Sequence, residues 1–227
     1  MEVLHRDELT LGGFAGLREH RLVGNPKAFG ARVPAGSWPG IGNFVDLADA
    51  RFVPHGETGM HPHREIDVIS VMVEGRIAHG GSLGTGEELT PYNVQIQRAG
   101  GEGFTHNETN PDDEENRMIQ LWVLPETPGE PAGYQVYRPA LGGSVRIYGG
   151  TDASSETFRS QTTLDVGLLQ QGQNVEWDGP FMAYLTKGQG TANGTAVADG
   201  DLLRGDDLKF AATEDVQLIV VRTLDET

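Results

Sequence analysis

Hydrophobic residues in this chain recur in short runs, and many of the runs alternate with polar residues at a period of two. The spacing of three to four that marks an amphipathic helix is nearly absent. Turn-forming residues separate the runs, and the chain holds 32 glycines and 12 prolines. The pattern therefore predicts an all-β fold of short strands and few short helices. The clearest strand patterns cover residues 45–53, 67–75, 93–103, 117–125 and 216–224, and the third alternates until it breaks at Gly100-Gly101.

A connector rich in proline and glycine, residues 125–133, interrupts these runs, and strand patterns begin again after it. Residues 179–205 then repeat the layout of residues 67–93. Each stretch has an apolar strand that ends near a glycine, a short hairpin and a polar turn. Two copies are too few for a solenoid. We therefore expect two β-rich units of the sandwich or barrel type, jelly-roll barrels included.

The charge balance indicates which kinds of binding partner to expect. The chain carries 17 basic and 33 acidic residues, a formal net charge of −16. Nucleic acids and anionic membranes are polyanions, so we expect neither as a partner. The sequence has no apolar run of membrane-spanning length, and its start does not resemble a signal peptide. These features predict a cytoplasmic, monomeric protein that acts on a small molecule.

Histidine is the residue type with the most informative distribution. The chain has no cysteine, so a metal ion would be held by histidine, aspartate or glutamate. All seven histidines lie within the first 106 residues. If the two halves are repeats, only the first can hold a histidine-based metal site.

Two pairs of candidate ligands stand two residues apart. His61 and His63 flank Pro62, and His106 precedes Glu108 by two positions. On a strand such residues share a face, and Pro62 indicates a strand start or an edge strand. The first pair alone would fit a histidine-rich loop equally well. If the second strand runs beside the first, three imidazoles and one carboxylate converge, a set that suits Fe, Ni, Mn, Co, Zn or Cu.

The same motifs resemble the pirin family of bicupins. The resemblance is dense over residues 55–125 and looser elsewhere. It rests on His61-Pro62-His63, Glu74-Gly75, Val94-Gln95, Ala99-Gly100, Gly103, His106, Glu108 and Gln120-Leu121-Trp122-Val123.

The resemblance implies two cupin-type β-barrels of the double-stranded β-helix type. Residues 1–135 would form the metal-binding cupin and residues 136–227 a metal-free one. One divalent transition metal, iron first among the candidates, would be bound by His61, His63, His106 and Glu108. The family implies quercetin 2,3-dioxygenase activity, with dioxygen and an aromatic polyphenol as substrates.

Glu108 would also act as the catalytic base, because a metal-bound carboxylate can dissociate and accept a proton from a substrate hydroxyl. Asp67 or Gln95 would orient the histidine ligands. Candidate apolar walls of the substrate pocket are Met60, Met72, Phe104 and Trp122.

The sequence departs from the family pattern at two places. Asp67 stands where the family commonly has glutamate, with a further acidic residue at Glu65, which we expect to be a solvated strand residue. Asn93 occupies a turn position where many cupins have glycine, and asparagine tolerates the left-handed conformation.

The remaining histidines are expected outside the site. We expect His79 to be solvated at a turn, His55 to lie on the surface, and His5 and His20 to be structural.

Three functions remain open. The first is a dioxygenase that opens a flavonol-like or enediol substrate. The second is a metal-binding regulator without turnover that acts through protein contacts, as the nuclear co-regulator of the same family is described. The third is another cupin reaction at the same site, such as isomerisation or hydrolysis. The acidic charge argues against the nuclear role for this chain.

Overall fold

The computed structural model describes residues 1–151 and 156–224, apart from the side chains of residues 85–87. These residues form β-strands joined by turns, with the single short α-helix α1 and the 3-10 helices η1 and η2. The prediction of an all-β chain with few short helices is confirmed. No helix among the described residues is long and apolar enough to cross a membrane.

The chain forms two compact units. The N-terminal unit consists of Leu9–Pro39 and Asn43–Arg138. The C-terminal unit consists of Met1–Glu8, Gly40–Gly42 and the residues from Pro139 onward. The first eight residues thus group with the second half of the chain, whereas the sequence-based division placed residues 1–135 together. Which unit binds metal stays a prediction.

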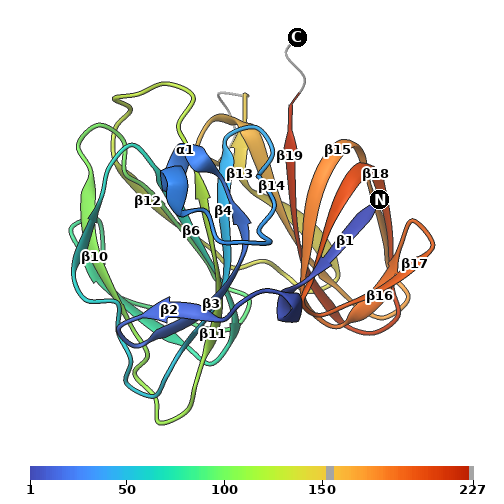
Figure 1. The fold of residues 1–227 in the computed structure, drawn as a ribbon, viewed down its shortest axis with the longest axis horizontal. Helices are drawn as coiled ribbons and strands as arrows, with labels where there is room; N and C mark the ends of the chain where they lie inside the picture. Colours follow the sequence, from blue (N-terminus) through green and yellow to red (C-terminus); the bar gives the residue numbers. More distant parts are fainter. Residues whose placement is uncertain (152–155, 225–227) are drawn as a thin grey trace. The chain divides into compact units, whose positions relative to one another are not determined.

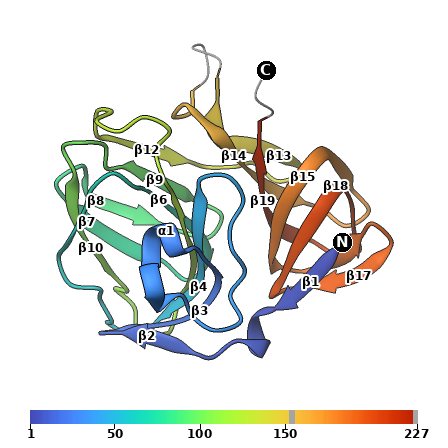
Figure 2. The ribbon, with the colours of Figure 1, turned by 45° about the horizontal axis from the view of Figure 1, so that its top comes forward.

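Two antiparallel sheets make up the N-terminal unit and curve around its interior (Figures 1 and 2). The seven-stranded sheet has the order β12-β9-β6-β11-β4-β3-β2 and the four-stranded sheet the order β5-β10-β7-β8. The elements are β2 (Gly12–Phe14), β3 (Leu17–Gly24), α1 (Pro26–Phe29), η2 (Gly30–Arg32), β4 (Phe44–Phe52), β5 (His61–His63), β6 (Asp67–Glu74), β7 (Ile77–Gly81), β8 (Thr85–Leu89), β9 (Val94–Arg98), β10 (Phe104–Thr109), β11 (Arg117–Val123) and β12 (Gly133–Tyr137).

The C-terminal unit is one eight-stranded sheet of order β13-β14-β19-β15-β18-β16-β17, with β1 also paired to β18. Figure 1 shows β1, drawn in blue, beside the orange strands of this unit. The elements are β1 (Glu2–His5), η1 (Arg6–Glu8), β13 (Gly143–Gly150), β14 (Ser160–Leu169), β15 (Asn174–Lys187), β16 (Gln189–Ala192), β17 (Thr195–Ala198), β18 (Asp201–Ala212) and β19 (Val216–Thr223).

The predicted repeat corresponds to equivalent strands in the two units. In the first unit β6 pairs with β9, and β7 and β8 form the hairpin between them. In the second unit β15 pairs with β18, and β16 and β17 form the hairpin. The copies differ in one respect. The hairpin strand β7 pairs with β10 in a separate sheet, whereas β16 pairs with β18 itself.

The turn after β6 requires its glycine. Gly75 has φ +67°, and a Cβ atom there would lie 2.8 Å from the Cβ of Asn116. Asn116 is held in this space by side-chain hydrogen bonds to the two segments that contain Arg76 and Phe52. Its side-chain nitrogen donates to the carbonyl of Arg76 at 2.7 Å, and its side-chain oxygen accepts from the Phe52 amide at 3.1 Å. The strand therefore ends at Glu74, as its sequence pattern predicts.

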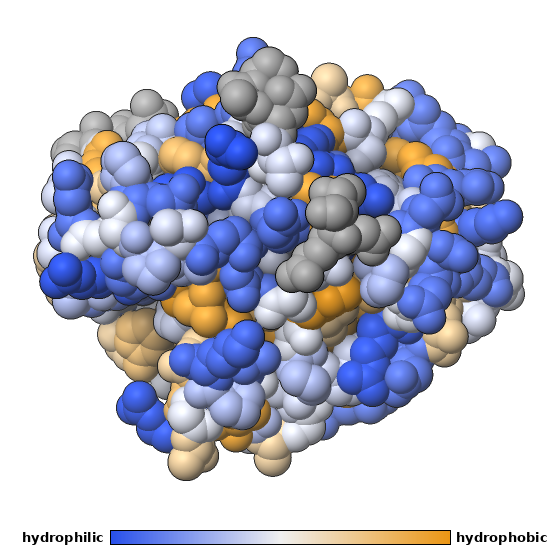
Figure 3. Space-filling model, turned by 90° about the horizontal axis from the view of Figure 1, so that it is seen from above, coloured by the Kyte–Doolittle hydropathy of each residue, from blue (hydrophilic) through white to orange (hydrophobic). Residues whose placement is uncertain are grey.

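Hydrophobic side chains fill the interior of the C-terminal unit. One core cluster of this unit includes Trp177, Phe181, Leu203 and Phe210, each at most 8% exposed. On the face shown in Figure 3, hydrophobic residues appear in small patches between hydrophilic ones. The N-terminal unit also has a packed cluster, around Phe52, Met72 and Ile77. This unit has a cavity beside the cluster, and Phe52 forms part of its lining.

Candidate metal centre

Two short strands bring the candidate ligands together. The second strand does run beside the first, because β10 pairs antiparallel with β5 and places His106 directly opposite His61. The burial of β10 alternates, so that His106 and Glu108 point inward while Thr105 is exposed. β5 is the edge strand of its sheet, as Pro62 indicates, because proline has no amide hydrogen for a second neighbour.

The Nε2 atoms of three imidazoles converge. His106 Nε2 lies 3.0 Å from His61 Nε2 and 3.1 Å from His63 Nε2. On two of the rings the other nitrogen is already engaged. His61 Nδ1 donates to the carbonyl of Gly59 at 2.8 Å, and His106 Nδ1 donates to Oε1 of Gln97 at 2.9 Å. A neutral imidazole has one donor and one acceptor nitrogen, so the lone pairs of both Nε2 atoms face each other. A cation between them satisfies both, and the residues therefore fit a metal ion.

Glu108 lies beside this group and is completely buried. Its carboxylate accepts hydrogen bonds from Ser70 Oγ at 3.1 Å and from Gln120 Nε2 at 3.3 Å. Ligand atoms of Glu108, His106 and His79 lie within 4.8 Å of one another, as do those of His61, His63 and His106. His106 belongs to both groups and therefore connects the carboxylate of Glu108 with the three imidazoles.

Burial sets the protonation states of these side chains. It lowers the pKa of His63 to about 4, with a smaller effect from the charge of His61. It lowers the pKa of His106 to about 2, with further effects from the neighbouring imidazoles. Burial raises the pKa of Glu108 to about 7, against the lowering effect of its two hydrogen bonds. His63 and His106 are therefore neutral near pH 7, which is the form that binds metals.

A cavity of about 300 Å³ opens onto the group. This volume falls at the lower end of the range typical of small-molecule sites. Polar groups from His61, His63 and Glu108 lie at one side, and the other walls are mainly apolar. The lining residues are Phe14, Leu17, Glu19, Arg21, Ala50, Phe52, Thr58, His61, Pro62, His63, Glu108, Met118, Gln120 and Trp122.

One wall of the cavity is charged. Arg21 forms ion pairs with Glu19 and with the fully buried Asp46. Its guanidinium lies 4.6 Å from the ring centre of Phe29, which is stacked on Trp122. Burial raises the pKa of Asp46 to about 7, although Arg21 acts in the opposite direction.

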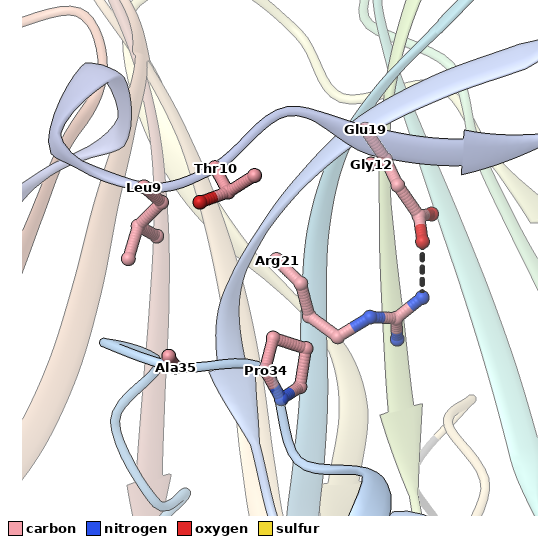
Figure 4. Close-up of a pocket in the computed structure, with 7 residues that line it drawn as sticks. All are labelled: Leu9, Thr10, Gly12, Glu19, Arg21, Pro34 and Ala35. Carbon is pink, nitrogen blue, oxygen red and sulfur yellow. Dashed lines mark hydrogen bonds and ion pairs between the residues drawn. The ribbon is translucent and has the colours of Figure 1, made fainter.

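A second, smaller cavity of about 100 Å³ shares Glu19 and Arg21 with the first. Figure 4 shows the two side chains reaching toward each other at this smaller cavity, joined by their ion pair. The Arg21–Glu19 pair is therefore a common wall of both spaces. Nothing in the sequence pattern predicted it.

The expectation for His79 is wrong. Its side chain is buried on β7, not solvated at a turn, and its residue is 2% exposed. β7 pairs with β10 so that His79 lies opposite Glu108. Its ring lies 5.6 Å from that of His106 and is stacked on Tyr134 at 5.7 Å. His79 therefore belongs to the surroundings of the candidate metal group.

Of the four predicted apolar walls, only Trp122 lines the cavity. Met72 is part of the packed core. Phe104 packs behind the histidines, with its ring centre 5.1 Å from that of His63. Met60 is 63% exposed. Strand alternation could not distinguish these positions, because a core-facing residue and a cavity-facing residue have the same pattern.

Gln97, and not Asp67 or Gln95, accepts the hydrogen bond from His106. Asp67 is buried and accepts from Arg98 Nε at 3.0 Å. The arginine thus compensates the carboxylate that differs from the family pattern. Gln95 is one step further away and donates to Gln97 at 3.1 Å. Gln97 could have been found from the alternation of β9, because it shares the face of Gln95.

Two turn expectations also need correction. Glu65 is not a strand residue. It has φ +52° and its carboxylate accepts from the Gly129 amide at 3.0 Å. In the turn before β9 the left-handed residue is Tyr92, with φ +73°, and not Asn93. Asn93 instead accepts hydrogen bonds from the amide and hydroxyl of Thr90 through its side chain.

The other histidines lie where the sequence suggested. His55 is on the surface and pairs with Asp113 at 2.8 Å. His20 contacts the carbonyl of Leu9 at 3.1 Å. His5 pairs with Asp201 at 2.9 Å, and this contact raises its pKa.

Sequence comparisons show which known proteins this chain is similar to. A family model described as Pirin matches residues 42–123. The chain is 30% identical over 174 residues to a Pseudomonas aeruginosa protein named "Putative quercetin 2,3-dioxygenase", an alignment that covers 71% of this chain and 75% of that relative. It is 27% identical over 150 residues to a protein of Escherichia coli K12 named quercetin 2,3-dioxygenase, covering 63% of this chain and 64% of the relative.

Solved structures give the same result for the fold. The bacterial pirin YhhW from Escherichia coli in complex with nickel(II) matches with a TM-score of 0.82 at 20% identity, over 100% of this chain and 99% of that chain. A quercetin 2,3-dioxygenase from Acinetobacter baumannii matches with a TM-score of 0.73 at 20% identity, over 99% of this chain and 86% of that chain. The prediction of two cupin-type barrels is confirmed, and the chain belongs to the pirin family.

Proposed function

We propose that the protein is a metal-dependent dioxygenase that opens a flavonol-like or enediol substrate with dioxygen. His61, His63, His106 and Glu108 would hold one divalent transition metal. The observation that carries the proposal is the convergence of three Nε2 atoms within hydrogen-bond distance, two of which have no proton to share. Names of relatives at 27–30% identity support the choice of reaction.

The donor set suits iron first, with nickel, manganese, cobalt, zinc or copper as alternatives. Imidazole and carboxylate ligands accept all of these ions, and availability selects among them. A related pirin was crystallised with nickel(II). When bound, such a metal supplies a Lewis acid that lowers the pKa of a coordinated hydroxyl and offers open positions to substrate and dioxygen.

Glu108 is the side chain that would move the proton. A base works best when its pKa lies near the working pH, and burial raises the pKa of Glu108 to about 7. Ser70 and Gln120 hold the two carboxylate oxygens in place. One of these oxygens would accept the proton of a substrate hydroxyl, which leaves the electron-rich anion that dioxygen attacks.

The cavity walls favour a flat aromatic substrate. Phe14, Phe52 and Trp122 provide apolar surface, which excludes water from the anion. Thr58 and Gln120 provide polar groups at the metal side, while Arg21 and Glu19 provide donors and an acceptor on another wall. A polyphenol has apolar faces and hydroxyl groups along its edges, and therefore complements both features.

The cavity also bears on the choice between an enzyme and a regulator without turnover. A metal that acts only on a protein-binding surface needs no enclosed space beside it. The space of about 300 Å³ at the histidines supports the enzyme. Substrate identity, a cytoplasmic location and a monomeric state stay predictions.

Turnover tests the proposal directly. Purified protein loaded with iron(II) or nickel(II) is mixed with quercetin, and loss of quercetin absorbance is followed together with oxygen uptake. We expect oxygen and quercetin to disappear in equal amounts, and His106→Ala to abolish both changes. The matched control is His55→Ala, because His55 is exposed and paired only with Asp113 on the surface.

Metal bound without consumption of quercetin or of several other flavonols would contradict the dioxygenase. The regulator without turnover, or another cupin reaction, would then be the better account.

A further inference from the structure

A buried chain of hydrogen bonds leads from Tyr134 on β12 to His106. The Tyr134 hydroxyl donates to Oε1 of Gln95 at 2.9 Å. Nε2 of Gln95 donates to Oε1 of Gln97 at 3.1 Å. The same oxygen of Gln97 accepts from His106 Nδ1 at 2.9 Å. Both glutamines are completely buried on β9. The bonds from Gln95 to Gln97 and from His106 to Gln97 are therefore made away from water, whereas Tyr134 is half-buried.

The direction of each bond fixes the next one. Because the tyrosine hydroxyl donates to the oxygen of Gln95, the nitrogen of Gln95 faces Gln97. That nitrogen can only donate, so Gln97 must turn its oxygen toward it. The nitrogen of Gln97 is then directed to His79 Nε2, 3.3 Å away, which accepts.

The orientation of Gln97 decides which nitrogen of His106 carries the proton. With the oxygen of Gln97 at Nδ1, His106 holds its proton there and presents a lone pair at Nε2. A flipped amide would present a donor to Nδ1 and move the proton to Nε2. That proton would point at the Nε2 atoms of His61 and His63, which lie 3.0 Å and 3.1 Å away. A ring in that form cannot bind a metal between them.

We infer that Gln97 is a positioning residue that holds His106 in its metal-binding tautomer, and that Tyr134 and Gln95 fix the orientation of Gln97. The inference rests on the proposed metal site. At many histidine ligands a carboxylate accepts the hydrogen bond from the ring nitrogen that does not bind the metal. Here the neutral amide of Gln97 would accept that bond.

Two readouts test the inference. The first is the tautomer of His106 in the metal-free protein, read from the nitrogen chemical shifts of the imidazole. The second is the affinity for cobalt(II), measured by competition with a chelator. The variants are Gln97→Met, which has no acceptor, Gln97→Glu, which keeps one, and Tyr134→Phe, which removes only the hydroxyl.

We expect Gln97→Met to populate both tautomers and to lower cobalt affinity by roughly 10- to 100-fold, the usual effect of losing such a partner. Gln97→Glu should keep the proton on Nδ1 and recover most of the affinity. Tyr134→Phe should shift the tautomer in the same direction as Gln97→Met, with a smaller loss of affinity. Its ring still stacks on His79.

Gln217→Met is the control for loss of a buried amide. Gln217 is also completely buried, but it lies on β19 of the C-terminal unit and bonds to Thr186. It should change neither readout. A His106 that keeps its proton on Nδ1 in Gln97→Met would overturn the inference. If Gln97→Met does not fold, an unchanged tautomer in Tyr134→Phe would overturn it.

The tautomer measurement needs no metal, so it separates this inference from the proposed function. Wild-type protein that binds no cobalt would contradict the metal site, while the tautomers would still decide the role of Gln97.

Discussion

At Glu108, the proposed carboxylate ligand, metal binding and proton binding would compete. Burial raises the pKa of its carboxyl to about 7, and a metal binds the carboxylate only after the proton has left. We therefore predict that metal affinity increases about tenfold per pH unit as the pH rises toward 7, and levels off above it. His63 and His106, with pKa values of about 4 and about 2, are neutral over this range and release no proton. Cobalt titrations between about pH 5.5 and pH 8 measure the slope.

Glu108→Gln is the control for this prediction, because it keeps the shape of the side chain and removes the titrating group. Its affinity should be lower and should depend less on pH over the same range. An equal slope in wild type and variant would show that the released proton comes from another group.

The candidate ligands could be predicted from the sequence because their spacing uses a local rule. Residues two apart on a strand share a face, and this holds for His61 with His63 and for His106 with Glu108. The roles of His79 and Gln97 depend on pairing between β7 and β10 and on packing of β9 against β10. These contacts join segments far apart in the chain. The alternation of β9 could offer Gln97 as a candidate beside Gln95, but only the packing of β9 against β10 selects it.

At the scale of elements, Arg21 on β3 compensates a charge on the neighbouring strand β4. Asp46 is completely buried and pairs with Arg21. We predict that Arg21→Met lowers the free energy of unfolding by about 3–5 kcal/mol, the usual cost of leaving a buried charge without its partner. Urea denaturation at a pH above the pKa of Asp46, which burial raises to about 7, measures the change. The loss should be smaller at lower pH, because Asp46 can then take up a proton.

Arg204→Met provides the matched control. Arg204 forms a two-bond ion pair with Glu2, but the side chain of Glu2 is 65% exposed. Exposed pairs contribute little to stability, because solvent screens both charges. If both variants lose the same free energy of unfolding, the buried Arg21–Asp46 pair stabilises the protein no more than an exposed pair does.

The existence of most strands could be predicted, but the way they combine into sheets could not. The patterns at 67–75 and 117–125 correspond to β6 and β11, which are neighbours in one sheet. The echo between 67–93 and 179–205 corresponds to equivalent hairpins. By contrast, β1 pairs with β18 near the other end of the chain. The edge of a sheet can form hydrogen bonds with any extended segment that reaches it. The separation of β1 and β18 along the chain therefore does not predict that they pair.

At the scale of the whole molecule, the two barrels have interiors of different character. The N-terminal unit has a cavity whose lining includes two histidines and a glutamate. The corresponding interior of the C-terminal unit is occupied by Trp177, Phe181, Phe210 and other apolar side chains. Every histidine from His20 to His106 belongs to the N-terminal unit, and His5 is engaged by Asp201. We therefore expect a single metal ion per chain.

Metal content per chain tests this account most directly. Protein purified after loading with iron(II), nickel(II) or cobalt(II) is freed of loosely bound ions and analysed for all transition metals. The account predicts one equivalent in wild type and in His55→Ala, and loss of nearly all metal in His61→Ala and His106→Ala. Full metal content in His106→Ala, or no metal in wild type under any loading condition, would contradict it.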